Sequence, residues 1–212
     1  MPALFRKLCT AALLPAALGT AQAQVAAITL SEPGQAFESA SYMLGFAFNV
    51  LQDVRLMGLG VYDHGADGLE ASAQVGLWLA GLDEPALLAD VPGGTAATLD
   101  GLFRFAPVAP RLLRAGEVYV VAAYLDGGTA TSYATGQGGV AVVDPRILVV
   151  ADRYGDGFFG LSLPSESDGF EGAWLGANLQ LAPVPAPPPA ALLAAGLAAL
   201  GWRMRRLRQP RP

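Results

Sequence analysis

The stretch EVYVVAAYL, residues 117–125, has the strongest β-strand character in the chain and decides its fold class. Five of its nine residues are Val or Tyr, and β-branched and aromatic side chains are enriched in strands. Further runs of strand character lie at 42–50, 54–62, 74–79, 86–91, 97–105, 146–151 and 174–181. Many short strands separated by Gly- and Asp-rich turns predict an all-β fold, with a single β-sandwich domain over residues 24–182.

Alternation within two of these runs indicates which side chains face the core. In QVGLWL, residues 74–79, the Val and Leu side chains point one way, while Gln74, Gly76 and Trp78 point the other. In FRF, residues 103–105, the two Phe side chains share a face and the Arg lies opposite. A sandwich strand has one inner face, so the second pattern is typical of an ordinary half-buried strand.

Charge is distributed unevenly along the chain. All 18 Asp and Glu residues lie between Glu32 and Glu171, where only six Arg accompany them, so this stretch has a formal charge near −12. The other seven basic residues lie at the two ends. Nucleic-acid binding needs a basic surface, so no nucleic-acid partner is expected. Cys9 is the only cysteine and precedes the domain, which therefore has no thiol for a disulfide or a Cys-ligated metal.

The N-terminal residues 1–23 have the order of a secretory signal peptide. Arg6 and Lys7 form a basic start, an apolar run of about a dozen residues follows, and Ala21-Gln22-Ala23 is an A-x-A cleavage site. Signal peptidase is therefore expected to cut after Ala23. The alternative is a buried amphipathic helix of the fold, which Pro15 in the middle of the run disfavours.

The C-terminal residues form three consecutive segments. A proline-rich linker spans 183–189, an uncharged run AALLAAGLAALGW spans 190–202, and a basic cluster spans 203–212. The apolar run is shorter than the about 20 residues of a full membrane span, so a short hydrophobic membrane helix is expected. Arg203, Arg205, Arg206 and Arg208 would hold the end of the chain on the cytoplasmic side.

This tail resembles the PEP-CTERM class of sorting signals, in the variant where Ala replaces Glu. Val184, Pro185, Ala186 and Pro187 form the motif that carries the resemblance, together with the apolar run and the Arg cluster. The resemblance implies cleavage near the Pro motif by an exosortase-type membrane transpeptidase. The protein would then pass from the inner membrane to the cell surface or an exopolysaccharide matrix. A simple C-terminal anchor that is never cut is the alternative.

Five short motifs follow one another along residues 36–182: LGFAF (44–48), LGVYD (59–63), QVGLW (74–78), FRF (103–105) and LRAGEVY (113–119). With these motifs in this order, the stretch looks like a jelly-roll-like domain of unknown function found in exported bacterial proteins. The resemblance implies a jelly-roll-like sandwich and supplies no chemistry.

Two turns carry a pair of carboxylates four residues apart, followed by a glycine: Asp63 and Asp67, then Asp152 and Asp156. Calcium takes several oxygen ligands from carboxylates and carbonyls in Gly-bearing loops, so both turns are candidate structural calcium sites. Neither matches the EF-hand spacing, and Asp-Gly is a common turn, so ordinary turns are the alternative. No other cofactor is expected. His64, the only histidine, is predicted to be a solvated turn residue.

DRYGDGFFG, residues 152–160, is the best candidate binding loop, because exposed aromatic rings on a sandwich can stack on sugars. Tyr154, Phe158 and Phe159 are its candidate glycan contacts, and burial in the core is the alternative. Nothing marks any two carboxylates as a catalytic pair, so an exported hydrolase is the least favoured function and no enzymatic activity is expected. The sequence favours a non-catalytic structural protein of the cell surface or exopolysaccharide matrix, with a carbohydrate-binding module as the alternative.

Overall fold

The computed structural model describes residues 23–32, 36–39, 41–125, 129–132, 140–158, 160–169 and 173–184, together with Leu200 and Trp202. The predicted signal peptide before Ala23, the sorting-motif residues Pro185, Ala186 and Pro187, most of the apolar run, the Arg cluster and Phe159 lie outside these residues. No helix among the described residues is both long enough and apolar enough to cross a membrane.

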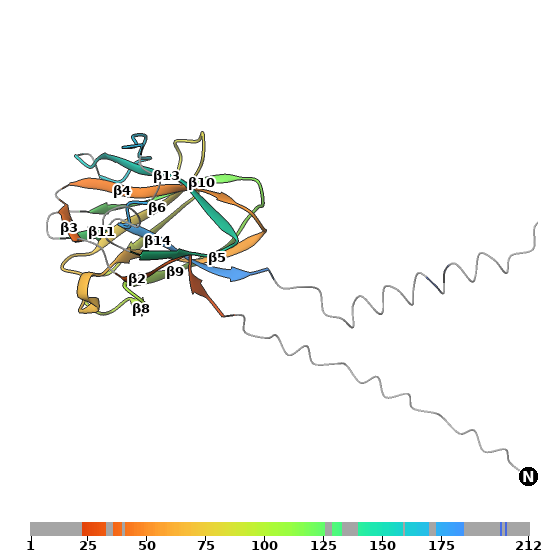
Figure 1. Ribbon diagram of the computed structural model, residues 1–212, viewed down its shortest axis with the longest axis horizontal. Helices are drawn as coiled ribbons and strands as arrows, with labels where there is room; N and C mark the ends of the chain where they lie inside the picture. Colours follow the sequence, from red (N-terminus) through yellow and green to blue (C-terminus); the bar gives the residue numbers. More distant parts are fainter. Residues whose placement is uncertain are drawn as a thin grey trace, which may run out of the picture.

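Two five-stranded antiparallel sheets pack face to face, which confirms the all-β, sandwich-like fold (Figure 1). The first sheet has the order β1 (Val25–Ala26), β14 (Ala177–Pro183), β5 (Val54–Tyr62), β9 (Phe103–Leu113) and β8 (Thr98–Asp100). The second has the order β13 (Ile147–Asp156), β4 (Tyr42–Val50), β10 (Val118–Leu125), β6 (Ala73–Leu79) and β7 (Leu87–Val91). Two smaller pairs are β11 (Thr129–Ser132) with β3 (Ala36–Ser39), and β12 (Val140–Val143) with β2 (Ile28–Glu32). The 3₁₀ turn η1 (His64–Ala66) follows β5.

Most of the strands expected from the sequence are present. Those at 42–50 and 54–62 have the predicted bounds, and those near 74–79, 86–91 and 117–125 differ by one residue at their first position. The run 97–105 is divided by a turn into β8 and β9, because Gly101 adopts a positive φ of 61° there. β13 extends five residues beyond its expected end and includes Asp152 and Asp156, where a turn was predicted.

The main strands pair in a nested order. β1 pairs with β14, β4 with β10, β5 with β9, and β6 with β7, all antiparallel. The outermost pair aligns Val25 with Leu181, so the two ends of the domain lie side by side (Figure 1). The register of Pro183 with Val54 places these ends at the start of β5, so the turn after Tyr62 lies at the opposite end of the sandwich.

The core lies between the two sheets and is rich in aromatic residues. Phe46 and Phe48 of β4 and Phe103 and Phe105 of β9 are at most 2% exposed. Burial of each such side chain contributes about 1.5–3 kcal/mol. The predicted alternation in 74–79 is confirmed, since its Val and Leu residues at 75 and 77 belong to this core.

The outward face of the second sheet carries a small apolar cluster. Ala47, Val120 and Ala122 form a separate apolar cluster there with Trp78. The indole of Trp78 lies over Gly76 of the same strand: a Cβ at Gly76 would come within 2.2 Å of the ring. Glycine at this position therefore allows a flat aromatic ring to rest directly on the sheet.

Candidate functional site

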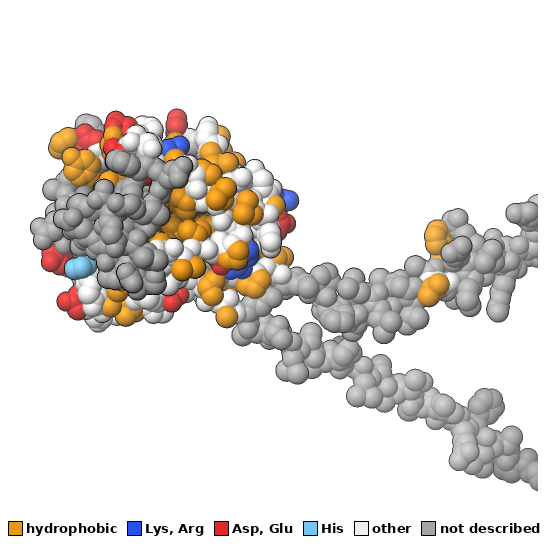
Figure 2. All heavy atoms as spheres, viewed as in Figure 1, with side chains coloured by type: hydrophobic (Ala, Val, Ile, Leu, Met, Phe, Trp, Pro, Cys, Tyr) orange, Lys and Arg blue, Asp and Glu red, His pale blue; other side chains and the backbone are white. Residues whose placement is uncertain are grey.

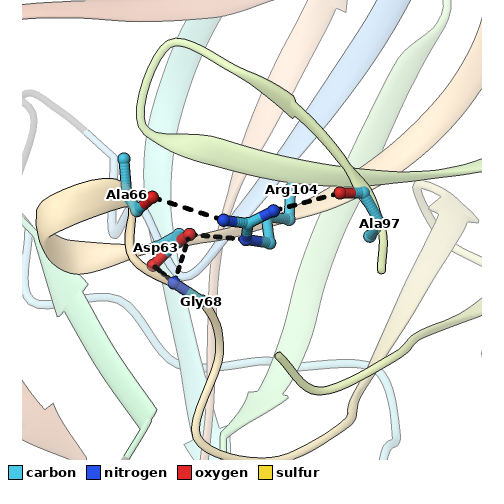
Figure 3. A network of polar contacts seen from close by, with 5 residues as sticks. All are labelled: Asp63, Ala66, Gly68, Ala97 and Arg104. Atoms are coloured by element: carbon cyan, nitrogen blue, oxygen red, sulfur yellow. Dashed lines mark hydrogen bonds and ion pairs between the residues drawn. The ribbon is translucent and has the colours of Figure 1, made fainter. Parts of the chain in front are cut away.

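The first carboxylate turn is organised by a buried ion pair (Figure 3). Arg104 of β9 donates from Nε to Asp63 Oδ2 at 2.6 Å, and its Nη1 and Nη2 donate to the carbonyls of Ala97 and Ala66. The backbone N–H of Gly68 donates to both oxygens of Asp63. Arg104 is 4% exposed and Asp63 is 1% exposed. Charge-assisted bonds inside such a site are strong, so this network fixes the turn to β9.

The prediction that β9 is half-buried, with Arg104 on its solvent-facing side, is wrong at Arg104. Arg104 faces away from the core aromatics as expected, but the turn after β5 covers it instead of solvent. Asp67 is exposed, and so is His64, whose Nδ1 lies 3.1 Å from Tyr62 Oη. Calcium at Asp63 and Asp67 stays a prediction, and Asp63 already has Arg104 as a counter-charge.

The prediction of a turn at the second carboxylate pair is wrong, because Asp152 and Asp156 both lie in β13 and pair with β4. Asp152 holds a loop onto this strand. Asp152 is fully buried and accepts hydrogen bonds from Ser167 Oγ at 2.7 Å and from the backbone N–H of Asp168 at 2.8 Å. Tyr154 and Glu166 exchange two backbone hydrogen bonds. Residues 160–169, here called the strap, are thereby joined to the edge strand of the second sheet.

The side chains around this junction are acidic. A hydrogen bond to Glu166 is the main cause that raises the pKa of Tyr154, and burial and the negative charge of Asp168 act in the same direction. Asp156 is exposed, and its Oδ1 accepts a hydrogen bond from the backbone N–H of Phe158. No cluster of three or more potential metal ligands occurs in the part of the chain that the structure describes. Calcium at Asp152 and Asp156 also stays a prediction.

The strap crosses the outward face of the second sheet. Leu161 and Leu163 pack on the cluster around Trp78, which is left 1% exposed. Ser162 donates from its backbone N–H and its hydroxyl to Met43 Sδ of β4. Trp78 donates from Nε1 to the carbonyl of Asp83, in the turn between β6 and β7. The indole therefore connects the strap to the β6–β7 hairpin.

A groove of about 320 Å³ lies between the β6–β7 hairpin and the strap. From the hairpin, Gln74, Trp78, Asp83, Leu88 and Asp90 line it. From the strap, Leu161 and Ser162 line it. Gln74 Nε2 donates to Asp90 Oδ1 at 3.1 Å, which orients both polar groups at the groove. Among the described residues that line it, none is basic.

The predicted glycan contacts do not line this groove. Tyr154 is half-buried beside the strap's acidic residues, while Phe158 is 80% exposed on the turn that precedes the strap. The lining residues Gln74 and Trp78 were not predicted as a site. Their common outward face was visible in the alternation of 74–79, and a Gln and a Trp flanking a Gly on such a face were the available signal.

No family model, no curated protein and no solved structure matches this chain.

Proposed function

We propose that this chain is an exported, non-catalytic protein that is sorted to the cell surface or an exopolysaccharide matrix by its C-terminal tail. The observation that carries the proposal is the order of proline motif, apolar run and Arg cluster over residues 184–208, combined with the A-x-A site at the N-terminus. Signal peptidase and an exosortase-like transpeptidase are the processing partners, and the short apolar run holds the protein in the inner membrane until cleavage.

The domain that this tail delivers is proposed to be jelly-roll-like. A jelly roll consists of eight strands in two sheets, and the nested pairs β1–β14, β4–β10, β5–β9 and β6–β7 support this topology, with β13 added at an edge. The adjacent domain ends at Val25 and Leu181 also support a surface role. A domain attached through one end presents its opposite end away from the membrane.

The sorting proposal is tested by changing the charge of the tail without changing its length. Substituting Arg203, Arg205, Arg206 and Arg208 with Ser should abolish processing and alter the location of the full chain in a host that carries an exosortase. Substituting the same four residues with Lys is the matched control and should leave both unchanged, because the positive charge is retained. Identical size and location of the Ser variant and the parent chain would refute the proposal.

A second proposed function, glycan binding, rests on a different observation. The groove beside the strap combines two Leu side chains with amide, hydroxyl and carboxylate groups. Ligand sites are concave and combine apolar walls with a few placed polar groups. Titration of the purified full chain with oligosaccharides tests this function, and binding to none of them would leave the structural role alone.

A further inference from the structure

The groove beside the strap has walls whose positions are set by contacts outside it. Trp78 forms its floor and is bonded to the hairpin through the carbonyl of Asp83. The strap is held from its other side by Asp152, which binds Ser167 and Asp168. Neither wall depends on a ligand for its position, so a ligand would meet a pre-formed site. Pre-organisation of this kind reduces the entropy lost on binding.

The groove offers apolar and polar surface together. Leu88, which is 59% exposed, and Leu161 present hydrocarbon from opposite walls. Gln74 and Ser162 present an amide and a hydroxyl. Sugar rings have the same mixed character, since their C–H faces are apolar and their hydroxyl groups donate and accept hydrogen bonds. The volume of about 320 Å³ lies at the small end of the range of ligand sites, about 300–1,000 Å³, and so fits a short saccharide segment.

The negative charge of the groove favours one class of saccharide over others. Asp83 and Asp90 line the groove without a basic residue beside them among the described lining residues. Figure 2 shows acidic side chains spread around the visible face of the domain, with basic ones at only a few places. Such a field repels uronic-acid and sulfated glycans and attracts cationic ones. An ammonium group entering the groove would find two carboxylates as partners.

We propose that the groove between the β6–β7 hairpin and the strap binds a glycan segment that carries free amino groups. Asp83 and Asp90 bind the ammonium groups, Gln74 and Ser162 bind hydroxyl groups, and Leu88 and Leu161 contact the C–H faces of the rings. This assignment rests on the glycan-binding function proposed above and names its site and ligand class.

The test titrates the purified full chain with a glucosamine tetrasaccharide that is fully deacetylated. Its N-acetylated counterpart has the same ring skeleton without the positive charges. Its affinity should be lower by a factor of about ten or more. A double variant with Asp83→Asn and Asp90→Asn should lose about tenfold or more in affinity for the amino form. Both residues are exposed, so the variant is expected to keep its thermal unfolding midpoint.

Glu84 supplies the matched control. It is exposed in the same turn as Asp83 but does not line the groove, so Glu84→Gln removes a charge without touching the site. Its affinity should stay within about twofold of the parent chain. The comparison between variants also cancels any effect of the basic tail, which all of them share. A further variant, Leu88→Ser, should weaken binding without changing its dependence on salt.

Three results would overturn the inference. One is the absence of binding at millimolar tetrasaccharide, and another is equal affinity for the amino and N-acetylated forms. The third is an equal loss of affinity in the Glu84 control and the double variant, which would reduce the effect to the overall charge of the domain. The location of the double variant in cells is measured in parallel. If the double variant reaches its normal location but no longer binds the tetrasaccharide, the groove and the sorting tail act independently. A failure of the glycan-binding proposal can then be told apart from a failure of the sorting proposal.

Discussion

The two carboxylate pairs read alike in sequence, but the first flanks the turn η1 and the second lies in β13, and different chemistry surrounds them. In each, the first Asp is buried and the second is exposed, so Asp63 corresponds to Asp152 and Asp67 to Asp156. Asp63 meets a guanidinium, that of Arg104. Asp152 instead accepts from neutral donors, the hydroxyl of Ser167 and the backbone N–H of Asp168.

This difference shows what an Asp pair four residues apart, followed by Gly, indicates in this chain. Asp63 directly follows β5 and Asp152 lies within β13, yet each supplies a buried acceptor that holds a later segment of the chain. Asp63 fixes the turn after β5 to β9 of the same sheet, whereas Asp152 fixes the strap to β13. Removing one partner of a buried ion pair leaves the other charge buried without a counter-charge, which is costly. Removing Asp152 costs less, because the exposed hydroxyl and N–H donors can form hydrogen bonds to water instead.

The largest expected effect therefore comes from Arg104→Met. The substitution leaves Asp63 buried without its counter-charge and should lower the free energy of unfolding by about 3–5 kcal/mol. Urea denaturation of the full chain measures it. Arg153 of β13, which donates from Nη1 to the carbonyl of Asp152, is the control. Arg153→Met should cost less than about 1 kcal/mol, and equal losses for the two would contradict the comparison.

Asp152→Ala should have a smaller but local effect. The loss of two hydrogen bonds to a carboxylate is expected to cost about 2 kcal/mol, because the exposed Ser167 and Asp168 regain water. Hydrogen exchange in residues 160–169 should accelerate and the fluorescence of Trp78 should shift to the red. Asp152→Asn retains one acceptor and should show about half of each change. Unchanged exchange in the strap would mean that Asp152 does not hold it.

The strap should also respond to alkaline pH. Its acidic surroundings, led by the hydrogen bond to Glu166, raise the pKa of Tyr154 above its ordinary value. The folded protein thus holds this proton more tightly than the unfolded chain, whose tyrosines titrate near about 10. The resulting stability is present below about pH 10 and is lost as pH rises through the higher folded-state pKa.

Tyr154→Phe removes this dependence and should make stability fall less steeply between about pH 10 and pH 12. Part of the slope should remain, because burial and Glu117 raise the pKa of Tyr119 to about 12. Urea midpoints collected across this range for the parent chain and the variant give the two slopes. Parallel slopes would show that the strap does not sense the Tyr154 proton.

The smallest effects are expected at the exposed members of the two pairs. Asp67→Asn and Asp156→Asn should each change stability by less than about 0.5 kcal/mol in the presence of a chelator. The same variants test the calcium prediction. If millimolar calcium raises the unfolding midpoint of the parent chain and either variant loses that rise, the metal is assigned to the corresponding carboxylate pair.

The sequence predicts most of this fold because its main strands are locally encoded. Alternation and β-propensity in 42–50, 54–62 and 117–125 locate three central strands to within one residue. The peripheral strands β1, β2, β3, β11 and β12 were not predicted, since short runs at a sheet margin have little periodicity. The partner of each strand also could not be predicted, because pairs such as β1 with β14 join residues at opposite ends of the chain.

The candidate site was less predictable than the fold. The outward position of Trp78 follows from alternation, but its cover follows from the path of the strap, which no local pattern encodes. Arg104 was assigned to the right face and the wrong environment, because its partner Asp63 is 41 residues away. Burial of such groups depends on tertiary contacts that a single sequence does not reveal.

The interior position of β14 has a mechanical consequence. Tension applied to the residues that follow Val184 enters the domain through this strand, which has β1 on one side and β5 on the other. Antiparallel hydrogen bonds run across the strands, so a pull along β14 loads its bonds in shear, many at once, rather than peeling them apart one by one. Under such a load the rate of unfolding decides how long the domain persists. A pull along β14 is therefore opposed by the hydrogen bonds to both neighbouring strands together.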